Sequence, residues 1–205
     1  PDYSSAASDV YKRQLKNHIG FLASDDLEGR ASGTFGDEMA KDYIKKFFEN
    51  ASLPTKRTVV IQEHYVPAER KWNLKPEDMT VKTYNIIATL PGNDPILKDE
   101  YVVIGGHYDG GAATAAQLKK LSGDKIYNNA DDNASGTATV LELFEKYAST
   151  NSNKRTLVFI LFGGEELGLL GSKYYVENPT INLNQVQLMI NLDMMGRLTL
   201  SLIHI

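Results

Sequence analysis

The sequence predicts an α/β protein with three layers (α/β/α) around a mixed, largely parallel central sheet. Three near-continuous apolar runs of strand length, at 101–107, 156–162 and 186–194, are typical of strands that are covered on both faces. A helical apolar pattern at 135–149 lies between the first two runs. Strands that alternate with helices in this way favour a three-layer fold with parallel strands.

The chain begins with residues 1–14, which show no helical or strand period. We expect them, and residues 199–205 at the other end, to be non-native tails outside a single domain over 15–198. The first clear helix is "GDEMAKDYIKKFFENA" (36–51), in which acidic residues come early and lysines late, as a helix dipole favours. Its apolar positions recur at helical spacing: Met39, Tyr43, Ile44, Phe47 and Phe48.

Two β-branched segments, "TYNIIATL" (83–90) and "YVVIGGH" (101–107), flank the turn-forming "PGNDP" and are predicted to pair as neighbouring strands. The segment "SGTATVLELFEKYAS" (135–149) carries an apolar stripe and is predicted to be a helix. The runs "TLVFILF" (156–162) and "VQLMINLDM" (186–194) are predicted to be central strands.

The composition argues against several classes of protein. With 205 residues, 42% of them hydrophobic and 23% charged, the chain is long enough for one globular domain. A net charge of −4 without a cluster of Lys and Arg argues against a nucleic-acid partner. Because there is no cysteine, any metal must be held by His, Asp and Glu. The longest apolar run, Leu157 to Phe162, is too short to span a membrane.

Ionisable side chains gather where three of the predicted strands end and where the helix at 135–149 begins. In open α/β sheets, ligands bind beyond the carboxyl ends of the strands, so we expect these side chains to meet in one crevice. The set comprises His107, Asp109, Asp131, Asp132, Glu165, Glu166 and Asp193.

Taken singly, each of these residues also fits an ordinary structural role. His107 could be a hydrogen-bonded histidine, Asp131 or Asp132 could cap the helix, the two glutamates could lie in solvent, and Asp193 could form a turn. Together, however, the carboxylates would repel one another, and a divalent metal ion would relieve that repulsion. Oxygen ligands with histidine and no sulfur fit Zn²⁺, with Mn²⁺ or Co²⁺ as substitutes. Two such ions would share a bridging carboxylate and a water.

The motifs around these residues resemble, in the same order, those of the co-catalytic zinc aminopeptidases of peptidase family M28. They are "HYD" (107–109), "NNADDNASGTA" (128–138), "GGEELGLLGS" (163–172) and "NLDMMGRL" (191–198). The earlier segment "LASDDLEGRASGTFGDEMAKDYI" also resembles the opening of many bacterial members. The resemblance covers about residues 15–198 and implies the zinc-peptidase (phosphorylase/hydrolase-like) fold, incomplete here at its C-terminus.

The resemblance implies two Zn²⁺ ions bridged by Asp131, the first of the two adjacent aspartates. His107 and Asp193 would complete one metal site, and Glu166 would bind the other metal. It also implies a cis peptide bond after the bridging residue, between Asp131 and Asp132.

Two further roles follow from the same resemblance. Glu165 would be the general base that takes a proton from the attacking water and passes it to the leaving amine. Asp109 would accept the second ring N–H of His107 and so orient the imidazole.

The remaining metal ligand of the family is a histidine from a later loop. His18 and His64 lie in no family motif, and His204 lies in the tail 199–205, so none of them is assigned to a metal. We therefore expect the polypeptide 1–205 by itself to be poorly folded or inactive.

The activity that the resemblance implies is that of an aminopeptidase acting on the N-termini of peptides or proteins. The alternatives are a single-zinc glutaminyl-peptide cyclotransferase, a non-catalytic receptor-like relative, and a carboxypeptidase or dipeptidase on the same scaffold. The resemblance also implies a secreted or periplasmic location, although no signal-peptide pattern is visible in the sequence.

Overall fold

The structure is a computed structural model that describes residues 3–50, 52–69, 73–111 and 125–197, with side chains from residue 9 onward. None of the helices in these residues combines the length and the apolar character that a membrane crossing needs. The helices and strands follow one another in the order α1 (Tyr3–Leu22), α2 (Phe35–Phe48), β1 (Thr58–Pro67), β2 (Met79–Leu90), β3 (Tyr101–His107), the irregular turn η4 (Ala130–Ser135), α4 (Gly136–Thr150), β4 (Thr156–Phe162), α5 (Leu170–Glu177) and β5 (Val186–Asn191).

The described strands form one mixed sheet in the order β1-β2-β4-β3-β5. β1 pairs antiparallel with β2, and β2 with β4, whereas β3 pairs parallel with both β4 and β5. The predicted α/β class with a mixed sheet is thereby confirmed. The predicted pairing of 83–90 with 101–107 is wrong, because β4 lies between them. All seven residues of β4 are buried, so the most apolar strand occupies the centre of the sheet.

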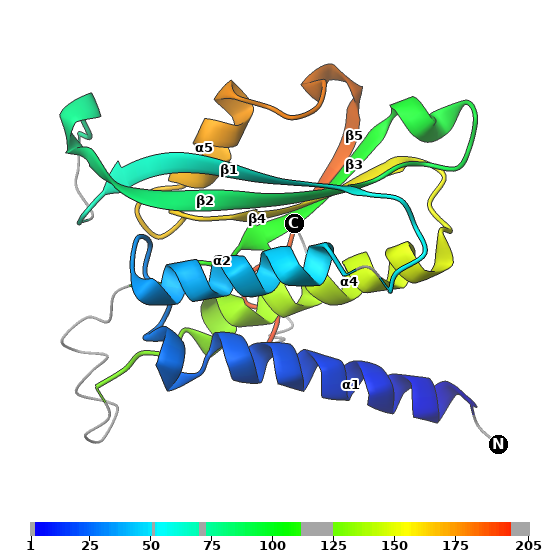
Figure 1. Cartoon of the computed structure of the whole chain (residues 1–205), viewed down its shortest axis with the longest axis horizontal. Coiled ribbons are helices and arrows are strands. Elements are labelled where there is room, and N and C mark those ends of the chain that lie inside the picture. The colour runs from blue at the N-terminus through cyan, green and yellow to red at the C-terminus, as the bar shows by residue number, and fades with distance from the viewer. Residues whose placement is uncertain (1–2, 51, 70–72, 112–124, 198–205) are drawn as a thin grey trace.

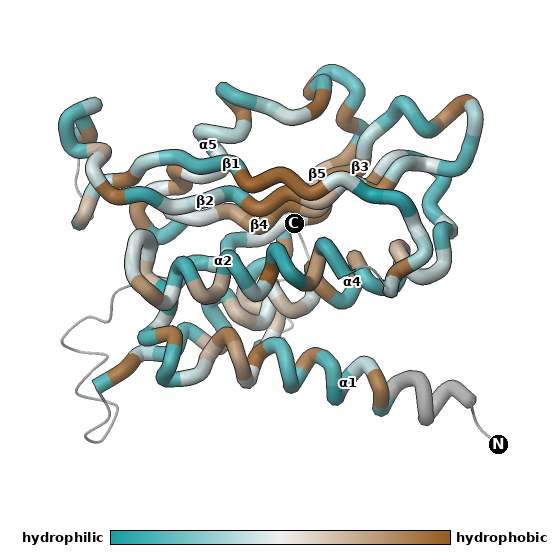
Figure 2. Tube along the Cα trace, in the orientation of Figure 1, coloured by the Kyte–Doolittle hydropathy of each residue, from teal (hydrophilic) through white to brown (hydrophobic). Residues whose placement is uncertain are grey.

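Helices cover both faces of the sheet (Figure 1), with α1, α2 and α4 on one side and α5 on the other. The strands contain the most hydrophobic stretches of the trace, whereas the helices alternate between polar and apolar positions (Figure 2). This is the three-layer arrangement that the sequence predicts.

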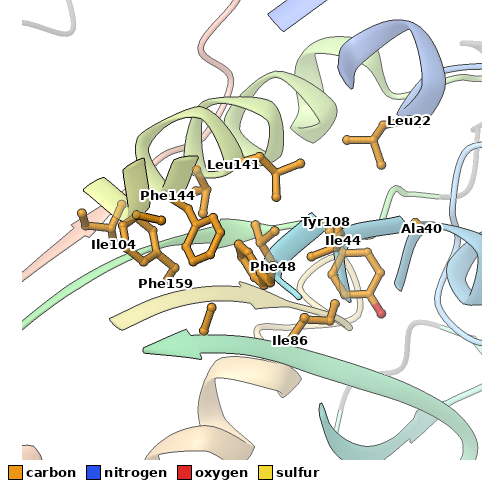
Figure 3. Packing of buried hydrophobic residues seen from close by; sticks show 14 of the residues in the cluster. Leu22, Ala40, Ile44, Phe48, Ile86, Ile104, Tyr108, Leu141, Phe144 and Phe159 are labelled. Atoms are coloured by element: carbon orange, nitrogen blue, oxygen red, sulfur yellow. The ribbon is translucent and has the colours of Figure 1, made fainter. Parts of the chain in front are cut away.

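The main core lies between the sheet and α2 and α4 (Figure 3). Phe144 of α4 packs edge-on against Phe48 of α2 and Phe159 of β4, with ring centroids 4.7 and 5.5 Å apart. Helix α2 begins where Thr34 accepts a hydrogen bond from the Asp37 N–H at 3.3 Å. The helix predicted at 36–51 is therefore confirmed and ends at Phe48.

Strand β5 differs from its prediction as a central, doubly covered strand. It lies at the edge of the described sheet, and Leu188, Met189 and Ile190 are 52, 43 and 39% exposed. The apolar pattern of a strand is the same whether or not neighbouring segments cover it. The sequence therefore does not show whether the strand lies at the centre or at the edge of the sheet.

The beginning of the chain is helical although its sequence shows no helical period, and the expectation that residues 1–14 are non-native stays a prediction. Residues 3–14, which show no period, form the first part of α1, and Gln14 donates a hydrogen bond to Glu145 of α4 at 2.9 Å. Val10 and Tyr11 remain more than two fifths exposed, so this part of the helix needs no continuous apolar stripe. The predicted tail 199–205 lies outside the described residues.

Candidate metal centre

The end of β3 places His107 among three carboxylates. The residue His107 is 3% exposed. Its Nε2 atom lies 3.2 Å from Asp132 Oδ1 and 3.5 Å from Asp193 Oδ1. Glu165 Oε2 lies 3.9 Å from the same nitrogen. One ligand atom each from His107, Asp132 and Asp193 can be chosen so that all lie within 4.8 Å of one another. A single metal ion could contact all three.

The other ring nitrogen of His107 faces Asp109. Nδ1 lies 3.1 Å from the Asp109 carbonyl oxygen and 3.5 Å from its carboxylate. With the proton on Nδ1 the imidazole donates to Asp109, which leaves the Nε2 lone pair free for a metal.

The fully buried Asp109 carboxylate also holds the turn after β4. It accepts the N–H groups of Glu165 at 3.2 Å and Glu166 at 3.4 Å. The hydroxyl of Ser32 donates to it at 3.1 Å. One carboxylate thus positions the histidine and both glutamates, a link that is not visible in the sequence because it depends on contacts between distant segments.

The structure brings Asp132, and not Asp131, to His107. Asp131 faces away: its Oδ1 accepts the Gly196 N–H at 2.9 Å, and its Oδ2 lies 3.2 Å from Arg197 Nε. The cis peptide bond joins Asp132 to Asn133, so its predicted position between Asp131 and Asp132 is wrong. We therefore revise the proposed bridging ligand from Asp131 to Asp132. The backbone of η4 is not helical at Asp132, and this local turn decides which carboxylate enters the crevice.

Asn133 ties the ligand-bearing segments together. Its side-chain amide donates to the carbonyls of His107 at 3.2 Å and Leu192 at 3.0 Å. Its oxygen accepts the N–H groups of Gly136 at 2.9 Å and Met194 at 3.2 Å. The residue is fully buried, and these four hydrogen bonds fix the end of β3, the segment around Asp193 and the start of α4 relative to one another.

The adjacent glutamates point to different places. Gly164, at φ +75°, turns the chain sharply after β4. Glu165 then reaches toward His107, whereas the Glu166 carboxylate lies over Gly111, where an added Cβ would come within 2.9–3.0 Å of it. Glu166 is not part of the three-residue group around His107.

The charges of the site favour a cation. Burial, with repulsion from Asp132 and Asp109, raises the pKa of Glu166 to about 7. Burial also raises the pKa of Asp132 and of Glu165 above their ordinary values. Burial lowers the pKa of His107, but its hydrogen bond to Asp109 and the surrounding carboxylates outweigh this effect and raise it to about 9.

All four shifts reflect an excess of negative charge in a partly dry site. Within the described part of the chain, His107 is the only cationic group within 4.0 Å of the carboxylates of Asp132, Glu165 or Asp193. One imidazole with several carboxylates fits Zn²⁺.

The other histidines lie elsewhere. His18 contacts Glu142 of α4, with Nε2 3.2 Å from the carboxylate, and His64 stacks on Tyr174 at 5.2 Å. His204 lies outside the described residues.

A mostly apolar cavity of about 590 Å³ opens beside the centre. His107, Glu165 and Asp193 line one end of it, and Phe162, Tyr175 and Met189 line its apolar wall. It could hold an apolar side chain next to the reacting groups.

Known proteins share this sequence pattern and fold. The chain is 31% identical over 200 residues to a probable zinc metalloprotease of Pyrenophora tritici-repentis. This alignment covers 94% of this chain and 42% of that protein. The chain is also 31% identical to leupeptin-inactivating enzyme 1 of Streptomyces exfoliatus, over 92% of this chain and 37% of the enzyme. The chain thus spans about two fifths of the length of the curated relatives it matches.

Solved structures of low sequence identity share the fold. A Zn-dependent exopeptidase from Parabacteroides distasonis superimposes with a TM-score of 0.67 at 18% identity, over 89% of this chain and 61% of that one. A glutaminyl cyclase from Fimbriiglobus ruber superimposes with a TM-score of 0.62 at 23% identity, over 82% of this chain and 54% of that one.

The family profile described as Peptidase family M28 matches residues 85–202, which include His107, Asp132, Glu165, Glu166 and Asp193. This match covers more than half of the 205 residues. The chain belongs to peptidase family M28.

Proposed function

We propose that this chain carries the catalytic centre of an aminopeptidase that uses two zinc ions. The observation that carries the proposal is the position of Glu165, whose carboxylate lies 3.9 Å from His107 at the edge of the group formed with Asp132 and Asp193. Relatives named as zinc metalloproteases and as leucine aminopeptidases support it.

His107, Asp132 and Asp193 would hold one ion, and Glu166 with Asp132 would hold the other. When bound, zinc would polarise the scissile carbonyl and lower the pKa of the attacking water toward about 7. Glu165 takes a proton from that water and delivers it to the leaving amine. Because burial and the neighbouring carboxylates raise its pKa, Glu165 is a stronger base than an exposed glutamate. Asp109 holds the His107 imidazole and the backbone of Glu165 in place through its contacts with both.

The experiment measures zinc content and the release of amino acids from peptides. Glu165→Gln should keep bound zinc but lower kcat by about 10²- to 10⁴-fold. Glu177→Gln, on an exposed residue at the end of α5, is the matched control and should change neither quantity. Unchanged turnover in Glu165→Gln would remove Glu165 from the mechanism.

A single-zinc glutaminyl cyclase is the second candidate. The three-residue group around His107 could hold one ion by itself, and a glutaminyl cyclase shares the fold. Zinc stoichiometry separates the two: two ions per chain support the peptidase, whereas one ion together with cyclisation of N-terminal glutamine supports the cyclase.

A further inference from the structure

Arg30 is a fully buried arginine outside the residues that the family profile matches. Its guanidinium donates hydrogen bonds only to backbone carbonyls among the described residues. Nε donates to Tyr108 at 2.9 Å, Nη2 to Asn129 at 2.9 Å, and Nη1 to Asn128 at 3.0 Å and to Leu22. A buried guanidinium needs such partners, because a charge left without them is costly to bury.

These carbonyls belong to the segments that carry the metal centre. Tyr108 stands between His107 and Asp109 at the end of β3. Asn128 and Asn129 directly precede η4, which carries Asp132. The guanidinium therefore joins two segments whose side chains meet at the centre, and it anchors both to the end of α1 through Leu22.

Backbone contacts around Arg30 reinforce this link. The Gly110 N–H donates to the Arg30 carbonyl at 3.1 Å. In return, the buried side chain of Asn129 donates to the carbonyls of Gly29 at 3.2 Å and Gly111 at 3.1 Å. Residues 29–30 thus lie between the two segments and bond to both.

We propose that Arg30 is a positioning residue that sets the separation of His107 and Asp132 and thereby the zinc affinity of the centre. The effect on zinc affinity rests on the proposed function, whereas the positioning of the two segments does not. The planar guanidinium reaches carbonyls in several directions at once, which a lysine ammonium on a flexible stem cannot reproduce.

The charge of Arg30 acts in the opposite sense to its geometry. Burial lowers the pKa of Arg30 to about 10, while Asp109 and Asp132 act to raise it, so the group stays protonated at neutral pH. A fixed cation near these carboxylates disfavours a metal cation. If charge alone mattered, Arg30→Met would tighten zinc binding and Arg30→Lys would leave it unchanged. If position matters, both variants should weaken zinc binding, by about 10- to 100-fold for a group that orients ligands.

Arg57 offers a matched control, because its guanidinium also donates to backbone carbonyls of a connecting segment. It donates to Phe48 at 2.7 Å, Thr55 at 2.8 Å, Leu53 at 3.2 Å and to Asn50, all between α2 and β1 or at the end of α2. Arg57 is only partly buried, so Arg57→Lys should lower thermal stability less than the Arg30 variants do, and it should leave zinc affinity unchanged.

The experiment combines zinc titration, by competition with a chelating dye, with hydrogen exchange of the zinc-free protein. Arg30→Lys and Arg30→Met should both weaken zinc binding, and both should speed exchange of the Gly110 and Ala134 amides, which bond to Arg30 and Asn129. Exchange in the middle of α4 should stay unchanged. Asn129→Ala, which removes the reciprocal bonds, should act in the same direction and serves if the Arg30 variants do not fold.

The results separate this inference from the proposed function. Wild-type affinity for zinc and unchanged exchange in Arg30→Lys would overturn the positioning role, as would a loss of affinity of equal size in Arg57→Lys. A wild-type chain that binds no zinc would count against the proposed function instead, and the exchange of the zinc-free variants would then decide the role of Arg30.

Discussion

Replacing each of the two adjacent aspartates by asparagine separates a metal ligand from a structural acid. Asp132→Asn removes a carboxylate that lies 3.2 Å from His107 Nε2, within the three-residue group. Asp131→Asn changes a side chain that faces Gly196 and Arg197. The two substitutions alter charge equally and differ by one position, so each is the control for the other.

The expected effect of Asp132→Asn is large and depends on zinc. At a free zinc concentration of 100 times Kd, binding stabilises the wild-type fold by about 2.7 kcal/mol. If the substitution weakens binding by about 100-fold, zinc then equals Kd and contributes only about 0.4 kcal/mol. For a domain of this size the difference of about 2.3 kcal/mol corresponds to about 5–9 °C in Tm.

Without zinc, Asp132→Asn should not destabilise the protein. Burial and the neighbouring carboxylates raise the pKa of Asp132, so its negative charge is unfavourable in the folded state at neutral pH. The zinc-free variant should therefore have a Tm equal to or higher than that of the zinc-free wild type.

Asp131→Asn should have little effect in either state. The amide oxygen can still accept the Gly196 N–H, and the lost ion partner Arg197 has a side chain that is 79% exposed. Because Arg197 holds its charge in solvent, we expect the loss of this pair to cost no more than about 1 kcal/mol.

Thermal denaturation with chelator and with excess zinc measures both variants, and a zinc titration supplies the affinities. Loss of the zinc-dependent Tm shift in Asp131→Asn, together with a wild-type shift in Asp132→Asn, would refute the assignment of the ligand from the structure.

Three further predictions concern the fold around the centre. Burial and the charge of Glu145 raise the pKa of Glu142 from 4.5 to about 7, so its contribution to stability is present below the unfolded pKa and is lost as the pH rises through 7. Because His18, with its pKa lowered to about 4, stays neutral over this range, Glu142→Gln should raise the free energy of unfolding more at pH 8 than at pH 5, as measured by urea denaturation; an equal change at both pH values would contradict this. Phe144→Ala should lower the free energy of unfolding by about 3–5 kcal/mol, because the ring is fully buried, whereas Phe35→Ala, on a residue that is 74% exposed, should change it by less than about 0.5 kcal/mol. Asn133→Leu should cost at least about 3 kcal/mol and weaken zinc binding, because it leaves the carbonyls of His107 and Leu192 and the N–H groups of Gly136 and Met194 without this partner; a stable variant with wild-type zinc affinity would show that the segments hold together without it.

Much of the fold follows from local patterns. The apolar stripe at 135–149 became α4, and the runs at 101–107 and 156–162 became β3 and β4. Each pattern reports which sides of a segment avoid water, and that property is set by a few neighbouring residues. Strand order is different, because it depends on which segments compete for the centre of the sheet. The insertion of β4 between β2 and β3 was therefore not visible in the sequence.

The sequence by itself determined which ionisable residues lie at the ends of the strands. It contains no cysteine and therefore no thiolate ligand, and these two features together determined the kind of metal that fits. Only the tertiary structure decided that Asp132 rather than Asp131 enters the crevice, because two identical neighbouring residues differ only in where the backbone of η4 points them. It also decided the position of Arg30, whose carbonyl partners come from residues 22, 108, 128 and 129. Contacts between segments so far apart form only when the chain is folded, so no local pattern encodes them.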